Sequence, residues 1–369
     1  MDIYSTLYMG GVVRAYQLKM KNYFLDTFFP SQINHTTEKV AFDTVENTHR
    51  IARFVHPDAK ARVTEDLGYS TQEVKPAYIK ELRVHTPDRN IQRLAGEPIT
   101  GNMTPEQRSK INMNLSIRDA MDMIQLRKEY MAFQACLDAK VSIVGEGLNY
   151  KINFGRNSAL TFELEASESW ADPTVNLHKS LTNLGRRFFR HAKVSPTHVL
   201  MNSKTFSYVI DNETVEKKLD LRRGDNSEIS VAAAKTQFGI WKAGRLGQYD
   251  LYVYENEYQD PDTGDTQEFM PDDTVLFLSS SMGGVRHYGM IHDFGAKLAA
   301  REYYADSWTE KNPSKRLFQI QSSPLMVPYR PNCSMKVRVV PAAPKNDEAE
   351  ATETCLLYTS DAADDRMRG

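Results

Sequence analysis

The sequence contains little of what disulfide-bonded, zinc-binding or membrane-spanning chains need. Only three of its 369 residues are cysteine, Cys136, Cys333 and Cys355, and no two of them form a Cys-x-x-Cys pair. Thiols this scattered fit a reducing compartment better than a disulfide framework or a zinc site. No hydrophobic run is long enough to span a bilayer, and residues 1–20 lack a signal-peptide pattern. The sequence therefore predicts a chain with neither disulfides nor a membrane span.

An excess of charge of either sign is also missing. Forty-eight acidic side chains oppose 46 basic ones, for a net charge of −2. This balance gives no electrostatic reason to expect tight binding to nucleic acid or to a membrane. With 41% hydrophobic and 25% charged residues, the composition is that of an ordinary globular protein, and the length predicts two or three domains.

Catalytic and metal-binding motifs with the correct spacing are missing as well. There is no Gly-x-Ser-x-Gly elbow, and Gly283-Gly284 lacks the Lys-Ser/Thr of a phosphate loop. His287 and His292 lie five apart on a predicted strand, hence on opposite faces, and cannot both bind one metal ion. The sequence therefore predicts no catalytic, cofactor-binding or metal site. A hydrolase site within residues 260–293 is the alternative.

Two short motifs have a simpler explanation than their best-known function. Arg223-Gly224-Asp225 is the adhesion tripeptide, but three residues match often by chance, and a turn after a helix explains the glycine. Residues 260–265 resemble a calcium loop, but Gly and Asp are transposed and the bidentate Glu is missing. We interpret residues 260–265 as a solvated turn between two strands.

The longest helical pattern covers residues 104–140. Thr104 suits the N-cap, Pro105 suits the first helical position, and Gln107 completes a capping box. Apolar residues recur in two stripes, so the pattern predicts a helix about 50 Å long with both apolar faces covered. Two shorter helices that meet near residues 116–119 are the alternative. A helix this long argues against a single spherical core.

Residues 69–84 read as one strand, in which Leu82 and Val84 alternate with charged residues. Pro76 confines this strand to a sheet edge or to its own start. A charged hairpin with few apolar anchors is barely stable by itself. We therefore predict that residues 56–88 form an arm that completes its burial on another molecule. Its candidate interface residues are Tyr69, Val74, Tyr78, Ile79, Leu82 and Val84.

Helices and strands alternate irregularly after the long helix. Gly145 and Gly147 predict a hairpin turn, and Asp172 is the expected cap of a helix with a single apolar face, Leu177, Leu181, Leu184 and Phe188. Ser203 is the expected cap of a helix that ends near residue 219, and another helix is expected at 228–237. Strands are expected at 197–201, 249–255, 274–279, 285–292, 317–321 and 334–340. Without a regular βαβα repeat, this order favours an α+β fold.

Charges of both signs crowd residues 216–228. The candidates for paired contacts across a subunit boundary are Asp220, Arg222, Arg223, Asp225 and Glu228. A solvated helix end is the alternative interpretation. Because surface ion pairs contribute only about 0–1 kcal/mol each, such a patch would set geometry and specificity more than strength.

Several stretches, in order between about residue 24 and residue 340, resemble the major capsid proteins of tailed phages of the lambda E type. In the first half they are Phe28-Phe29, Thr36-Thr37-Glu38-Lys39-Val40, Ser70-Thr71-Gln72-Glu73 and Pro76-Ala77-Tyr78-Ile79-Lys80. The later ones are residues 218–228, Phe269-Met270-Pro271-Asp272-Asp273-Thr274, Arg286-His287-Tyr288-Gly289 and Ile320-Gln321-Ser322-Ser323-Pro324-Leu325-Met326. The resemblance implies the Hong Kong 97-type capsid fold.

In that fold the resemblance implies an N-terminal arm at residues 1–45 and an extended loop at 56–88. The peripheral domain would be 46–55, 89–171 and 316–340, with the spine helix at 104–140, and the axial domain 172–315. The implied function is self-assembly, as hexamers and pentamers, into the icosahedral head of a tailed double-stranded DNA phage. A nanocompartment shell protein of the same fold is the alternative.

The resemblance also implies partners and a location. The partners are further copies of the chain, scaffolding, portal and decoration proteins, and genomic DNA enclosed without sequence-specific binding. The location is the virion capsid, and the host cytoplasm during assembly. We expect residues 341–369 to be a disordered acidic tail. Residues 355–369 resemble a translated sequencing-library adapter, with a genuine short tail as the alternative.

Overall fold

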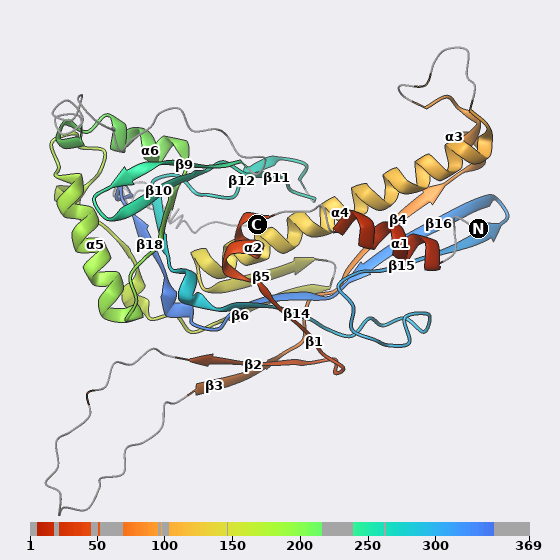
Figure 1. Ribbon diagram of the computed structural model, residues 1–369, viewed down its shortest axis with the longest axis horizontal. Helices are drawn as coiled ribbons and strands as arrows, with labels where there is room; N and C mark the ends of the chain where they lie inside the picture. The colour runs from red at the N-terminus through yellow and green to blue at the C-terminus, as the bar shows by residue number, and fades with distance from the viewer. Residues whose placement is uncertain are drawn as a thin grey trace, which may run out of the picture.

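The computed structural model describes residues 6–17, 22–45, 51, 69–94, 97, 103–145, 147–215, 239–261 and 263–342. The molecule is elongated (Figure 1), with α5 (Leu177–Ala192) and α6 (Ser203–Ile210) beside a sheet at one end. From the centre, α4 (Pro105–Leu137) runs to the other end. A hairpin of β2 (Val40–Val45) and β3 (Tyr69–Val74) leaves the body between them. Helices and strands are mixed without a βαβ repeat, so the predicted α+β class is confirmed.

The predicted long helix is α4, which is continuous over 33 residues, so the alternative of two shorter helices is wrong. Its capping box is present: the Gln107 N–H donates to the Thr104 hydroxyl, and the Thr104 N–H donates to the Gln107 side chain. The last two turns of the helix are almost entirely buried. Leu115 and Met123 are 51% and 45% exposed. The prediction that both apolar faces are covered is therefore wrong for the first half of the helix.

The largest sheet has six strands in the order β7-β18-β13-β8-β10-β9. Their bounds are β7 Thr161–Glu163, β8 His198–Met201, β9 Ile240–Leu246, β10 Tyr249–Tyr254, β13 Thr274–Leu278 and β18 Ser334–Arg338. The predicted apolar stripe of α5 packs into the core beside this sheet, where Leu177, Leu181, Leu184 and Phe188 are at most 4% exposed. This part of the sequence analysis is confirmed.

Two predicted helix caps are wrong. The cap of α5 is Asn176, whose side chain accepts from the Lys179 N–H, while Asp172 accepts from the Thr174 N–H in the preceding turn. The cap of α6 is Asn202, one residue before the predicted Ser203. In both cases the cap is an asparagine whose side-chain oxygen accepts a free N–H of the first turn. The helix expected at 228–237 lies outside the described residues.

A three-stranded sheet packs against the first half of α4. Its order is β15-β16-β4, with β15 at Tyr304–Lys311, β16 at Ser314–Ser322 and β4 at Ile79–His85. The helix α1 (Thr6–Gln17) packs against both α4 and β15. The core between them is formed by Met9, Val13, Met113, Ile117, Ala120, Met121, Ile124, Tyr303, Ala305, Phe318 and Ile320.

Residues 69–84 form two strands in two different sheets, so the prediction of one strand is wrong. β3 pairs with β2, from Val45 opposite Tyr69 to Val40 opposite Val74. β4 pairs with β16 instead. Pro76 lies between the two strands, where its missing N–H removes no ladder bond. A sequence has no local signal for this change of partner, because both partner strands are remote along the chain.

The remaining short strands complete the centre of the molecule. β1 (Ser31–Asn34), β14 (Gly284–Tyr288) and β17 (Pro324–Pro328) form a three-stranded sheet, and α3 (Pro87–Ile91) precedes α4. The predicted hairpin is β5 (Lys140–Gly145) with β6 (Leu148–Asn153). Residues 260–265 connect β11 (Glu257–Gln259) to its antiparallel partner β12 (Thr266–Glu268), which confirms the predicted turn between two strands.

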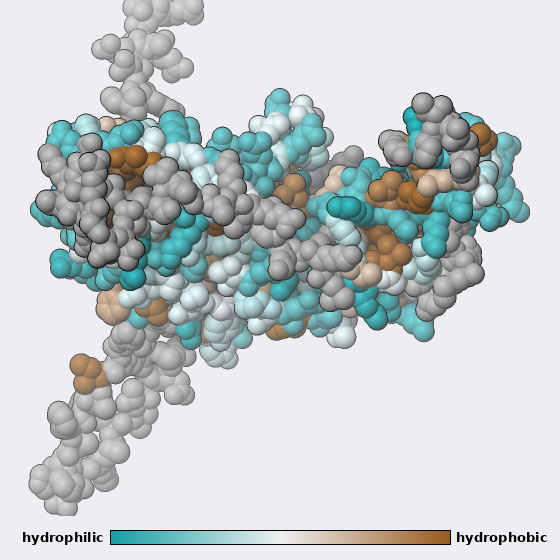
Figure 2. Space-filling view, turned by 45° about the horizontal axis from the view of Figure 1, so that its top comes forward, coloured by the Kyte–Doolittle hydropathy of each residue, from teal (hydrophilic) through white to brown (hydrophobic). Residues whose placement is uncertain are grey.

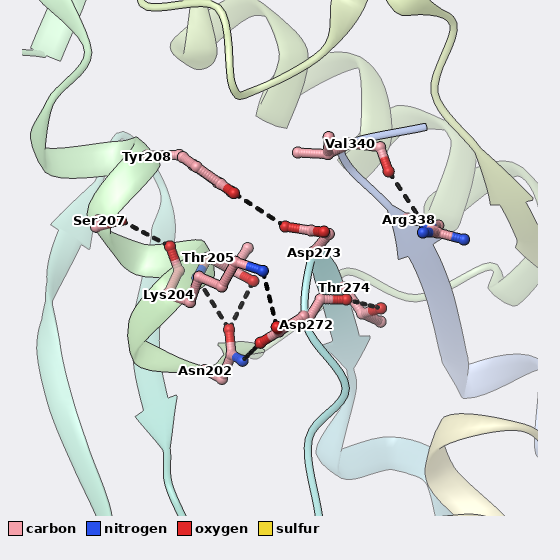
Figure 3. A network of polar contacts seen from close by, with 10 residues as sticks. All are labelled: Asn202, Lys204, Thr205, Ser207, Tyr208, Asp272, Asp273, Thr274, Arg338 and Val340. Atoms are coloured by element: carbon pink, nitrogen blue, oxygen red, sulfur yellow. Dashed lines mark hydrogen bonds and ion pairs between the residues drawn. The ribbon is translucent and has the colours of Figure 1, made fainter. Parts of the chain in front are cut away.

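The motif Phe269-Met270-Pro271-Asp272-Asp273-Thr274 fastens α6 to the start of β13 (Figure 3). The Asn202 amide and the Lys204 ammonium both donate to the Asp272 carboxylate, and the Tyr208 hydroxyl donates to Asp273. The contact with Lys204 lowers the pKa of Asp272 below its usual value. The second aspartate has a φ of 56°, a left-handed conformation that Asp tolerates better than most residues. The motif therefore has a structural role.

A buried carboxylate on α4 holds the N-terminal arm. The helix α2 (Tyr23–Phe28) receives no side-chain cap from Asn22. Instead, the Phe24 and Leu25 N–H groups donate to the two carboxylate oxygens of Glu129, at 2.7 Å and 3.0 Å. Glu129 is 2% exposed, and burial raises its pKa to about 7 although these N–H groups oppose the shift. The arm is thus capped by a residue about 100 positions away.

We expect Glu129→Gln to change how stability depends on pH. The folded-state pKa of about 7 lies above the ordinary value of 4.5, so the folded chain binds this proton more tightly than the unfolded chain. The contribution of Glu129 to stability is therefore fully present below pH 4.5 and is lost as the pH rises through 7. Between these values the slope is at most about 1.4 kcal/mol per pH unit.

The measurement is urea unfolding of the parent and the variant at several pH values between 4.5 and 8. The difference between the two proteins is needed because His287, whose pKa burial lowers to about 4, contributes a slope of opposite sign between 4 and 6.5. Parallel curves for parent and variant would show that Glu129 does not titrate in this range.

Candidate subunit interface

The strand β4 presents one side to α4 and the other to solvent. The Arg83 guanidinium donates to the Asp119 carboxylate at 2.6 Å and also contacts Met123, which fixes this strand against the helix. Because side chains alternate along a strand, Leu82 and Val84 must lie on the opposite face of the sheet. They are 46% and 45% exposed.

Four apolar side chains meet on that face. In the register of the sheet, Val84 lies opposite Leu317 of β16, and Leu317 lies opposite Trp308 of β15. Trp308 is 40% exposed, whereas Leu317, in the middle, is 7% exposed. We call Leu82, Val84, Leu317 and Trp308 the apolar row. It crosses all three strands of a sheet whose other face is packed on α4.

The apolar row is suited to binding a protein surface. Its four side chains are uncharged, and Trp308, at the end of the row on the edge strand β15, is the type of residue that anchors protein interfaces. Exposed apolar clusters are uncommon on a hydrophilic surface. Figure 2 shows one such surface of this molecule, where the hydrophobic patches are few and separate.

A strained loop lies at the base of the same face. Asp293 accepts from the Gly295 N–H and from the Gln321 side chain, which also accepts from the Tyr78 hydroxyl. The consecutive residues 297 and 298 both have positive φ values, 55° and 54°. This frame presents Phe294, which is 93% exposed. Phe294 is thus a further exposed aromatic side chain beside the strands of the apolar row.

The structure separates the predicted interface residues into three that are exposed, Tyr69, Leu82 and Val84, and three that are partly buried, Val74, Tyr78 and Ile79. Tyr69 is 70% exposed on β3, apart from the row that contains Leu82 and Val84. The other three bury surface within this chain: Val74 packs on the main core, Ile79 packs on the core beneath α4, and Tyr78 donates to Gln321.

The remaining candidates, Asp220, Arg222, Arg223, Asp225 and Glu228, lie outside the described residues. Conversely, the sequence analysis did not single out Trp308 and Leu317, the other two members of the apolar row. A signal for their hairpin was present, because Asn312-Pro313 is a turn pair between two runs of alternating residues. What could not be read from the sequence was the pairing with β4, which completes the row.

His287 and His292, the two histidines of the predicted strand 285–292, do not lie on one strand. β14 ends at Tyr288, so His292 lies outside the strand on which it was expected. His287 lies 2.7 Å from His35, ring nitrogen to ring nitrogen. Within the described ranges, no group of three or more His, Cys, Asp or Glu side chains is placed to hold a metal ion. No helix in those ranges is long and apolar enough to cross a membrane.

An extended hairpin, a spine-like helix and an exposed apolar row define a subunit of a self-assembling shell. The family of phage major capsid protein E matches residues 5–339, and the chain belongs to this family. The capsid function expected from the resemblance, that of a tailed-phage major capsid protein, is confirmed, and the role is structural. The family match also decides against the nanocompartment alternative.

The relatives cover nearly all of the chain. The major capsid protein of Escherichia phage lambda is 26% identical over 351 residues, which is 92% of this chain and 100% of that protein. The major capsid protein of Escherichia phage N15 is 25% identical with the same coverage.

Among solved structures, a putative capsid protein of an E. coli CFT073 prophage aligns with a TM-score of 0.68 at 20% identity, covering 91% of this chain and 99% of that one. A phage-related protein from Bordetella bronchiseptica has a TM-score of 0.51 at 12% identity and covers 89% and 96%. The Hong Kong 97-type fold is confirmed.

Proposed function

We propose that the apolar row and the β2–β3 hairpin are contacts through which copies of this chain join into the hexamers and pentamers of an icosahedral head. The observation that supports this most is the row itself. It is formed from three strands of one sheet, and Leu82, Val84 and Trp308 are exposed in the single chain, an apolar surface that a neighbouring protein surface can cover. Tyr69 and Phe294 provide further exposed aromatic side chains.

The free energy of burying the apolar row favours a shell, in which each subunit has several contacts, over an isolated pair of subunits. Burying a large apolar side chain contributes about 1.5–3 kcal/mol when it starts fully exposed, whereas Leu82, Val84 and Trp308 start 40–46% exposed and Leu317 is already buried. Association costs an estimated 4–15 kcal/mol in lost freedom of motion. One row against one neighbour therefore gives weak binding. Several contacts per subunit, closed around a ring, give a stable capsomer.

We also propose domain limits that follow the strand pairing. The extended loop is then 40–74, because β2 pairs with β3. The peripheral domain contains α4 together with β4, β15 and β16, because these share one core. The axial domain contains α5, α6 and the six-stranded sheet, to which β7 and β18 belong.

By analogy with the family, we infer that scaffolding, portal and decoration proteins are partners of the shell. We further infer that the shell encloses the genomic DNA without reading its sequence, and that assembly takes place in the host cytoplasm before the protein becomes part of the virion.

The role of the extended loop is tested by shortening it at its paired base. Val45 and Tyr69 lie directly opposite each other, so an Asn-Gly turn can join them in place of residues 46–68. Phe42 and Val40 stay buried at 4% and 0% exposure, and the body should remain folded by circular dichroism. We expect no closed shells by negative-stain microscopy.

A matched control inserts an Asn-Gly pair before Gly147, in the turn of the β5–β6 hairpin. This control is expected to assemble normally. If the shortened extended loop unfolds the chain, the loop belongs to the core. If shells still form, the loop is not an assembly contact.

A further inference from the structure

The solvent-facing side of α5 carries positive charge only. Lys179, Asn183, Arg186, Arg190 and Lys193 follow one another at alternating intervals of four and three residues, which places them on one face of the helix. The opposite face is the buried apolar stripe. The helix contains no acidic residue. We call these five residues the basic stripe, and it extends over about 21 Å.

A hollow of about 420 Å³ lies beside the basic stripe, lined by Asn183, Arg186, Arg187, Arg190 and His191. Arg187 is held at its edge, because its Nε donates to the Ala159 carbonyl at 3.0 Å and its guanidinium lies 3.5 Å from the centre of the Phe162 ring. All side chains that line the hollow are basic or amide. The hollow is open to solvent along the helix.

Arg186 and Arg190 are exposed and form neither an ion pair nor a hydrogen bond with any part of the chain that the structure describes. They differ in this from Lys204, Lys242 and Lys336, which each pair with an aspartate. Adjacent like charges on a helix repel each other. An anion bound along the basic stripe would remove this repulsion.

We propose that the basic stripe binds the phosphate backbone of DNA independently of sequence. Guanidinium groups match the geometry of phosphate oxygens and bind them through paired hydrogen bonds. Duplex DNA presents about one negative charge per 1.7 Å of its axis, a continuous partner for a row of cations. An acidic protein segment is a poorer fit, because stable protein contacts use apolar anchors, and the helix's exposed Phe189 lies to one side of the stripe.

This inference rests on the proposed function, in which each shell contains many copies of the chain around its genome. A net charge of −2 for the chain makes each contact weak, and repetition makes the sum significant. With four cations on phosphates, the logarithm of the binding constant should fall with the logarithm of salt concentration with a slope of about −3 to −4.

The test measures binding of a fluorescent 30-base-pair duplex of mixed sequence to unassembled full-length protein, by anisotropy, between 50 and 200 mM NaCl. The variant is Arg186→Glu with Arg190→Glu. The control is Lys140→Glu with Lys151→Glu, the same change of net charge at two exposed lysines of the β5–β6 hairpin. We expect the variant to lose at least tenfold in affinity and about half of the salt slope, because two of the four cations remain, and the control to stay within about threefold of the parent.

Three outcomes overturn the inference. Equal losses in variant and control would mean that only net charge matters. No binding of DNA by the parent, with binding of polyglutamate instead, would identify an acidic protein segment as the partner. Unchanged DNA binding with failed shell assembly in the variant would make α5 a subunit contact. Shell formation by the parent is scored separately by microscopy, and its failure would count against the proposed function alone.

Discussion

Replacing Trp308 with lysine is expected to abolish shell formation while leaving the subunit folded. Trp308 is 40% exposed in the single chain, so the substitution also removes some packing within the chain, and the free energy of unfolding should fall by about 1–3 kcal/mol, within the range that single substitutions cost. In a shell the same position would place an ammonium group against apolar side chains of a neighbour. An interface anchor lost in this way costs about 2–4 kcal/mol per contact, repeated at every copy.

The matched control is Thr309→Lys, which adds the same charge on the same strand but on the other face of the sheet. Sedimentation velocity should show shells for the control and only unassembled subunits or small oligomers for Trp308→Lys. Val84→Lys, two strands away in the same row, should behave as Trp308→Lys does. Normal shells from both row variants would show that the apolar row is not an assembly contact.

The largest loss of stability is expected from Lys128→Met. The Lys128 ammonium is buried with the Glu302 carboxylate at 2.6 Å, and its Nζ lies 4.2 Å from the centre of the Tyr303 ring. Burial lowers the pKa of Lys128 to about 8, and the contact with Glu302 opposes part of this shift. Removing the cation leaves the Glu302 carboxylate mostly buried without its countercharge. Breaking a buried pair in this way costs about 3–5 kcal/mol.

Urea unfolding of Lys128→Met, Glu302→Gln and the double variant measures how strongly the two buried groups interact. Lys128→Met and Glu302→Gln should each destabilise the chain, and the double variant should cost clearly less than the sum of the two, because no charge is then left unpaired. Lys315→Met, which removes one partner of the exposed Lys315–Glu310 pair, should cost no more than about 1 kcal/mol. Additive losses would show that the two buried groups do not interact.

The parts of the fold that could be predicted from the sequence depend on short-range rules. Thr104 and Gln107 mark the start of α4, and the four apolar residues of α5 lie on one face, because helix caps and the helical period are local properties. The turn between β5 and β6 follows from its two glycines in the same way.

The parts that could not be predicted depend on remote partners. Lys128 and Glu129 look like solvent-facing residues of a helix, and their burial follows only from Glu302 and from the N–H groups of the arm. Leu82 and Val84 were predicted interface residues, but the strand that contains them pairs with β16, and Trp308 completes their row from a third strand. Sequence separations of 104 residues or more make such pairings invisible to a local pattern.

The central claim is that the apolar row is covered by a neighbouring copy in the assembled shell. Val84→Cys in a Cys355→Ser background provides a thiol on the row, and Cys136 and Cys333 are fully buried. The rate of its reaction with a water-soluble maleimide is measured in unassembled protein and in purified shells. The account predicts rapid labelling of the free subunit and at least tenfold protection in shells. Equal labelling rates in the two states would contradict it.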